Sequence, residues 1–162
     1  MKLSDIPKHV TDIDPPWFGH QFKKKYSKYP GNEPPNFEDV EPCFHLKYYD
    51  GPLSGIAKFD GHYFYVKCIY GEDRKWWASW ELTPEERTSV LENNRLFEEH
   101  VGSHNSYIKN ENEDFVRNLD LVKPQESWDN FYKNANKPKV DYDSIEQRDI
   151  FGILRNPFWN YC

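Results

Sequence analysis

Two stretches of alternating apolar and polar residues, Ile56–Phe59 and His62–Tyr70, meet at the dipeptide Asp60-Gly61. Asp-Gly suits a type I′ turn, because both central residues of that turn adopt positive φ. Alternation with a period of two is typical of a strand that buries one of its faces. The sequence therefore predicts a β-hairpin here.

Similar alternation flanks the hairpin on both sides, in residues 44–49 and 75–82. In the second run, one face carries Trp76, Ala78, Trp80 and Leu82, and the other carries Trp77, Ser79 and Glu81. We expect a four-stranded antiparallel β-meander with one apolar face, which leaves Trp77 on the outer face. The alternative is that the C-terminal segment folds back and buries both faces.

A helix is predicted to follow the meander. Thr83-Pro84-Glu85-Glu86 is a capping box with proline at the first helical position. Gly102 marks the end, so the helix should span 84–101 and lie across the face that carries Trp76 and Trp80. Strands followed by a helix predict an α+β fold, a four-stranded antiparallel β-meander packed against one main helix.

The chain is predicted to divide after residue 42. Seven of its twelve prolines lie in residues 1–42, and proline fixes φ and interrupts helices, so this part should form an extended arm. Residues 43–162 should form a single α+β domain. A second capping-box pattern, Ser144-Ile145-Glu146-Gln147, predicts a C-terminal helix that ends before Asn156.

The composition narrows the class of protein. The chain carries 21 Lys+Arg against 27 Asp+Glu, a net charge of −6, which argues against a generally basic nucleic-acid binder. Its apolar runs are too short for a membrane span, and its three cysteines form no CxxC pair. We expect a cytoplasmic protein without a membrane segment, a disulfide framework or a cofactor.

Known catalytic motifs are absent from the sequence. It contains no GxxxxGK[ST], GxGxxG, GxSxG or HExxH pattern, and the His100/His104 pair is interrupted by Gly102. No metal site is therefore expected. A dispersed site remains an alternative, a small hydrolase in which His45 or His62 acts as a general base with Asp50 or Asp60.

Aromatic residues make up 17% of the chain, whereas alanine occurs only at positions 57, 78 and 135. Large rings can supply a core that is short of smaller apolar side chains. Tyrosine and tryptophan also anchor protein interfaces and stack on nucleobases. Both uses remain open from the sequence.

Basic and aromatic residues alternate in one segment of the arm, which includes Lys23, Lys24, Lys25 and Tyr26. Ammonium groups can meet phosphates while rings stack, so this cluster is a candidate contact for a phosphate-rich partner. A solvated loop whose tyrosines pack back on the domain is the alternative interpretation.

The charge pattern favours binding over catalysis. Residues 111–129 hold six carboxylates against two cations, and the helix 84–101 holds five glutamates against two arginines. Such an acidic surface suits a basic surface on a partner protein, although it can also serve only to keep the protein soluble. Our leading prediction is a non-enzymatic inhibitor or adaptor that contacts a protein partner; small acidic phage proteins that block a host defence or nucleic-acid enzyme have this profile.

A small-ligand or nucleotide-binding module is the alternative binding function. In that case Trp77, Tyr63 or Tyr65 stacks on a base and Lys67 or Arg74 contacts a phosphate. Trp77, as a large ring on an outer sheet face, is the main candidate contact for a partner or ligand in either function.

Overall fold

The computed structural model describes residues 38–48, 51–70, 74–102, 107–117 and 123–158. Their fold is α+β, as the sequence predicts. The elements are β1 (Glu41–Tyr48), β2 (Pro52–Phe59), β3 (His62–Tyr70), β4 (Trp76–Glu81), α2 (Pro84–His100), β5 (Tyr107–Lys109), β6 (Phe115–Arg117), α3 (Gln125–Tyr132), α4 (Tyr142–Gln147) and β7 (Gly152–Arg155).

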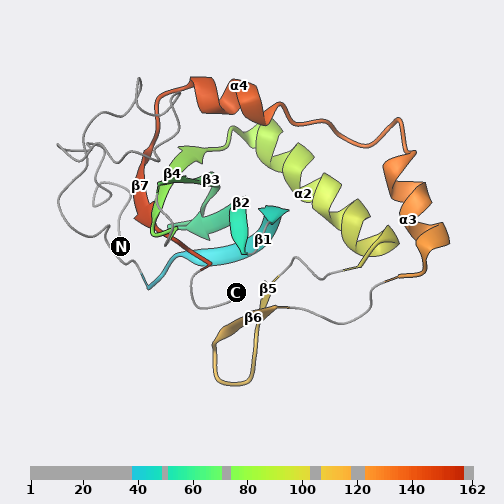
Figure 1. The fold of residues 1–162 in the computed structure, drawn as a ribbon, viewed down its shortest axis with the longest axis horizontal. Coiled ribbons are helices and arrows are strands. Elements are labelled where there is room, and N and C mark those ends of the chain that lie inside the picture. Colours follow the sequence, from blue (N-terminus) through green and yellow to red (C-terminus); the bar gives the residue numbers. More distant parts are fainter. Residues whose placement is uncertain (1–37, 49–50, 71–73, 103–106, 118–122, 159–162) are drawn as a thin grey trace.

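The predicted meander is confirmed, and a fifth strand extends it (Figure 1). The sheet has the order β1-β2-β3-β4-β7, and every neighbouring pair is antiparallel. At the predicted hairpin turn, Asp60 has φ 48° and Gly61 has φ 76°, as a type I′ turn requires. β1 begins at Glu41, so the boundary predicted after residue 42 lies inside a strand.

β7 replaces the end of the predicted C-terminal helix. α4 ends at Gln147, and Gly152–Arg155 pairs with β4 in the register Ala78↔Ile153 and Trp77↔Leu154. Ile153 and Leu154 are both buried, one on each side of the sheet. An edge position beside β4 offers this short apolar segment hydrogen bonds and burial on both faces, which a solvent-exposed helix does not.

Each face of the sheet supports its own apolar cluster. We call the face that carries Tyr65 and Trp80 the helix face, because α2 and α4 contribute Val90 and Ile145 to its cluster. The opposite face, which carries Phe64 and Trp77, is the tail face. Its cluster contains Ala57, Phe59, Phe64, Val66, Trp77, Leu154 and Phe158.

Trp77 is fully buried, so the prediction that it lies exposed on the outer face is wrong. The chain after β7 returns over the tail face, and the rings of Phe158 and Trp77 lie 5.6 Å apart between centroids. The indole Nε1 of Trp77 donates a hydrogen bond of 2.7 Å to the carbonyl of Arg74. The alternative in which the C-terminal segment buries both faces therefore describes the structure.

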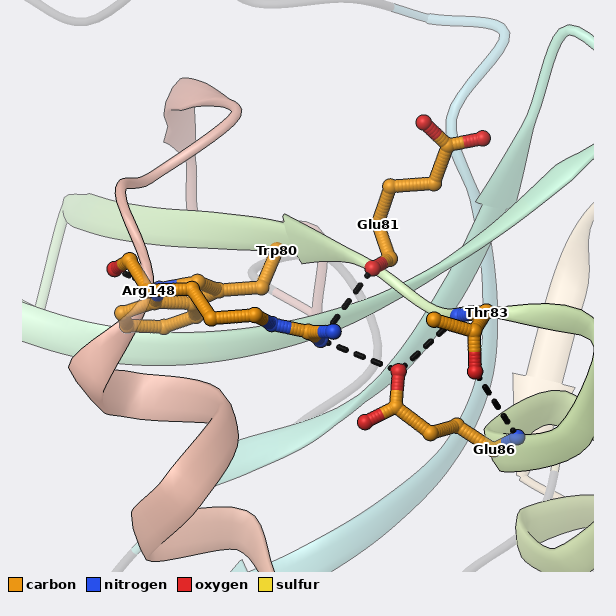
Figure 2. A network of polar contacts seen from close by, with 5 residues as sticks. All are labelled: Trp80, Glu81, Thr83, Glu86 and Arg148. Atoms are coloured by element: carbon orange, nitrogen blue, oxygen red, sulfur yellow. Dashed lines mark hydrogen bonds and ion pairs between the residues drawn. The ribbon is translucent and has the colours of Figure 1, made fainter.

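A polar network joins α2 to the sheet and to α4, and Figure 2 shows its members. The capping box is confirmed, because Thr83 Oγ1 accepts from the backbone of Glu86 and Glu86 Oε1 accepts from the backbone of Thr83. The same Glu86 oxygen accepts from Arg148 at 3.0 Å, and the carbonyl of Arg148 accepts from Trp80 Nε1 at 3.1 Å. One carboxylate thus links the start of α2 to the end of α4.

The remaining elements lie outside the sheet. β5 and β6 form a two-stranded hairpin that projects away from the helices (Figure 1). α3 packs against the far end of α2, where the rings of Phe97 and Phe131 meet edge to face at 5.4 Å. Of the helices in the described ranges, none has the length and apolarity to cross a membrane.

We predict that Trp77→Ala and Trp80→Ala each lower the free energy of unfolding by about 3–5 kcal/mol, because each change removes a fully buried indole from a packed cluster. Chemical denaturation measures both. The exposed Leu91→Ala is the control, with an expected change within about 0.5 kcal/mol. A Trp77→Ala protein as stable as the wild type would contradict the burial of the tail face.

Gly55→Ala should destabilise the protein by about 1–3 kcal/mol through overpacking. A Cβ at this position would lie 2.5 Å from Phe158 Cζ and 2.6 Å from the carbonyl oxygen of Phe44. In a double-mutant cycle measured by denaturation, Gly55→Ala and Phe158→Ala should be less than additive, because loss of the ring relieves part of the clash. Strict additivity would show that the ring does not pack on Gly55.

Candidate functional site

The structure places the alternative contacts of the predicted nucleotide site on two different faces of the sheet. Tyr63, Tyr65 and Lys67 alternate along the helix face of β3, whereas Trp77 belongs to the cluster on the tail face. Trp77 and the two tyrosines therefore cannot stack on the same base. The predicted contacts Lys23, Lys24, Lys25 and Tyr26 lie outside the described residues.

Arg74 lies in the loop before β4, with φ 53°. A Cβ added to Gly51 would lie 2.6 Å from its guanidinium atom Nη1, so the arginine packs against that glycine. Its carbonyl accepts the indole hydrogen bond of Trp77. The structure thus places Arg74 beside the tail-face tryptophan, whereas Lys67, the other predicted phosphate contact, lies on the helix face of β3.

A polar cavity of about 350 Å³ lies between the helix face of the sheet and the start of α4. The residues that line it are Leu46, Lys47, Ser54, Tyr65, Val140, Asp141, Tyr142, Asp143 and Glu146. Only Tyr65 among them was a predicted site residue. Seven of these nine residues carry a polar or charged side-chain group, which distinguishes this cavity from the apolar clusters around it.

Three polar side chains occupy one cross-strand row beside the cavity. Lys47 pairs with Ser54 and Ser54 pairs with Lys67 in the strand register, so all three share the helix face. The Lys67 ammonium forms an ion pair with Glu146 of α4. Ser54 is 1% exposed, and its Oγ has no hydrogen-bond partner of regular geometry in the described chain, although it approaches the Tyr65 hydroxyl.

The buried Tyr65 and the half-buried Tyr142 complete the polar wall. Tyr65 stacks on Trp80 at 5.5 Å and tilts against Tyr142 at 4.9 Å, and its hydroxyl donates to Glu146 Oε1 at 3.4 Å. Burial raises the pKa of Tyr142 well above its usual value; burial and then the nearby Glu146 carboxylate raise the pKa of Tyr65 in the same direction. Both phenols are therefore neutral near pH 7. The ring of Tyr65 is fully engaged within the core, so the prediction that it stacks on a base is wrong.

A second cavity, of about 250 Å³, lies next to the first between β1, α2, α3 and α4. We call it the aromatic groove. Its lining residues are Phe44, His45, Leu46, Val90, Asn93, Asn94, Phe97, Phe131, Tyr132 and Tyr142. Tyr132 is the most exposed of these rings, at 58%. Leu46 and Tyr142 line both cavities.

Acidic residues gather on the helices. Residues 84–100 and 125–149 together hold eleven Asp and Glu against six Lys and Arg. Several of these cations are engaged locally: Arg95 pairs with Glu92 and Glu99, and Lys133 lies 3.8 Å from Asp129. The helical side of the molecule therefore keeps a surplus of negative charge.

Among the described residues, the two candidate general bases lie apart, and Asp50, one of their predicted partners, lies outside the described residues. The ring of His45 is buried against Phe158 on the tail face, whereas His62 lies at the exposed hairpin end, 2.5 Å from a Glu81 oxygen. Burial raises the pKa of the Cys43 thiol to about 12, which keeps it protonated. Within the described ranges, no three His, Cys, Asp or Glu side chains converge as a metal site would require.

Sequence reasoning missed Ser54, Tyr142 and Glu146. Each is an ordinary polar residue in its local sequence, and the strand register together with the position of α4 brings them together.

Comparison with protein-family models, curated proteins and solved structures gave no significant match. The geometry of the two cavities therefore carries the functional argument.

We predict a loss of stability above pH 10, because the unfolded tyrosines ionise near pH 10 while Tyr65 and Tyr142 stay protonated in the native protein. The unfolded state then binds fewer protons, so the free energy of unfolding falls as pH rises. Tyr142→Phe should remove part of this decline in denaturation series across pH 10, whereas Leu91→Ala should keep it. An unchanged decline in Tyr142→Phe would contradict the burial of that phenol.

Proposed function

We propose that this protein is a non-enzymatic binding protein, an inhibitor or adaptor that captures a basic segment of a partner protein. The aromatic groove within the acidic helical side carries this proposal. An apolar side chain of the partner would enter the groove, and flanking Lys or Arg residues would face the surrounding carboxylates. Apolar anchors in pockets supply most of the affinity in such interfaces, and charge supplies orientation and association rate.

Tyr132 is the best single anchor on the protein's side. It is 58% exposed at the rim of the groove, and its ring meets that of the buried Phe131 edge to face at 5.1 Å. A large ring that is held by a buried neighbour loses little conformational freedom on binding. We therefore assign to Tyr132 the role that the sequence analysis gave to Trp77.

The charge distribution favours a basic peptide over nucleic acid. Phosphates would be repelled by the surplus of carboxylates in residues 84–100 and 125–149, which exceeds the local ion pairs. Lys137 lies over the ring of Phe131 at 4.1 Å, so one of the nearby cations is used within the protein. These observations support a protein partner for the described domain and leave the arm residues Lys23, Lys24 and Lys25 as a separate candidate contact.

Three matched peptides test the proposal: one with a leucine anchor flanked by arginines, one with glutamates in place of the arginines, and one with serine in place of the anchor. Fluorescence anisotropy should detect binding of the first alone, and its affinity should fall with added salt. Tyr132→Ala should weaken that binding by about tenfold or more. Leu91→Ala, which removes an exposed apolar side chain outside the groove, is the control.

Equal binding of the arginine and glutamate peptides would contradict the acidic surface as the recognition element. Unchanged affinity in Tyr132→Ala would contradict the groove. Both variants alter side chains that are at least 36% exposed, so melting temperatures close to that of the wild type are expected.

A further inference from the structure

The rings of Phe131 and Tyr132 already hold a cation of the protein itself. The ammonium of Lys137 lies 4.1 Å from the centroid of the Phe131 ring and 5.5 Å from that of the Tyr132 ring. Both distances fall within the range of about 6 Å over which the face of a ring attracts a cation. Among the described residues no carboxylate forms an ion pair with Lys137, so the two rings hold this ammonium.

The loop after α3 brings Lys137 to this position. Asn134 Oδ1 accepts a hydrogen bond of 2.9 Å from the backbone of Asn136, and the carbonyl of Asn134 accepts one of 3.5 Å from the backbone of Lys137. Asn93 of α2 then donates to the carbonyl of Pro138 at 2.7 Å. The backbone is thus held at Lys137 and at Pro138, whereas the long lysine side chain can leave the rings by rotation about its own bonds.

The ammonium lies beside the aromatic groove. Phe131 and Tyr132 line the groove, whereas Lys137 is not among its lining residues. An apolar side chain of the partner in the groove would therefore place a flanking cation close to the same two rings. Guanidinium is more weakly hydrated than ammonium and stacks on aromatic faces, so arginine suits this position better than lysine does.

On the basis of the function proposed above, we propose that the rings of Phe131 and Tyr132 form a subsite for an arginine of the partner protein. Lys137 occupies this subsite in the free protein, and the guanidinium of the partner displaces it. α3 ends at Tyr132 without a basic residue in its last turn, and the negative end of a helix dipole favours a cation there. Because the contacts of Lys137 with the rings have to be broken first, the subsite selects arginine over lysine.

The arginine peptide described above, and versions with lysine or citrulline in place of arginine, test this selection. Citrulline keeps the shape of arginine without its charge. Fluorescence anisotropy should show the arginine peptide binding about threefold more tightly than the lysine peptide, and the citrulline peptide binding most weakly. Equal affinity of the arginine and lysine peptides would overturn the proposal.

Two lysine variants test the competition. Lys137→Ala should tighten binding of the arginine peptide by about threefold, because it empties the subsite. Lys139→Ala, which removes an equal charge from an exposed lysine nearby in the chain, should change that affinity by less than about twofold. Equal effects of the two variants would overturn the displacement of Lys137.

NMR reports the displacement directly. In the free protein the ε-methylene protons of Lys137, next to an ammonium over the Phe131 ring, should be shifted upfield by the ring current. Saturation with the arginine peptide should return them to the position of an exposed lysine, whereas a change of long-range charge alone would not. An upfield shift that persists at saturation would overturn the proposal.

A small probe separates the subsite from the proposed function. Failure of all three peptides to bind would contradict the proposed function, and N-acetyl-arginine amide, which carries the guanidinium without an apolar anchor, then tests the subsite alone. Titrated into the full chain, it should give saturable shifts at the amides of Phe131 and Tyr132 and at the Lys137 ε-methylene. Absence of these shifts, or equal shifts with N-acetyl-citrulline amide, would overturn the subsite.

Discussion

The antiparallel pairing of β7 with β4 is the contact on which both sides of the structure depend. The chain enters this pairing from α4, which places Ile145 and Glu146 above the helix face. It leaves the pairing toward Phe158, which packs on the tail face beside Trp77 and above Gly55. One short strand at the sheet edge thereby provides part of the cover for each face of the meander.

Large rings account for much of both clusters. On the tail face, Phe59 and Phe64 stack at 4.0 Å, and on the helix face Tyr65 stacks on Trp80. Buried rings of this size remove much apolar surface from water, so a chain with few alanines can still form a core. In the part of the chain that the structure describes, most rings are thus used in packing, and Tyr132 is the most exposed of the large apolar or aromatic side chains there.

The two cavities lie in one region of the molecule but differ in chemistry. One is lined by hydroxyl-bearing and charged side chains, and the other is lined mainly by rings within an acidic surface. Leu46 and Tyr142 form part of both walls, so an occupant of either cavity contacts side chains that the other also uses.

The sequence by itself determined the features that depend on neighbouring residues. The Asp60-Gly61 turn, the strand alternation and the Thr83 to Glu86 capping box are local, because backbone preference and hydrogen bonds within a few residues specify them. The tertiary structure alone decided that Trp77 is buried, that 152–155 forms a strand, and that Ser54 lies near Glu146. Alternation with a period of two shows which side chains of a strand share a face. It does not show which distant segment covers that face, because packing across the whole sheet decides how remote segments pair.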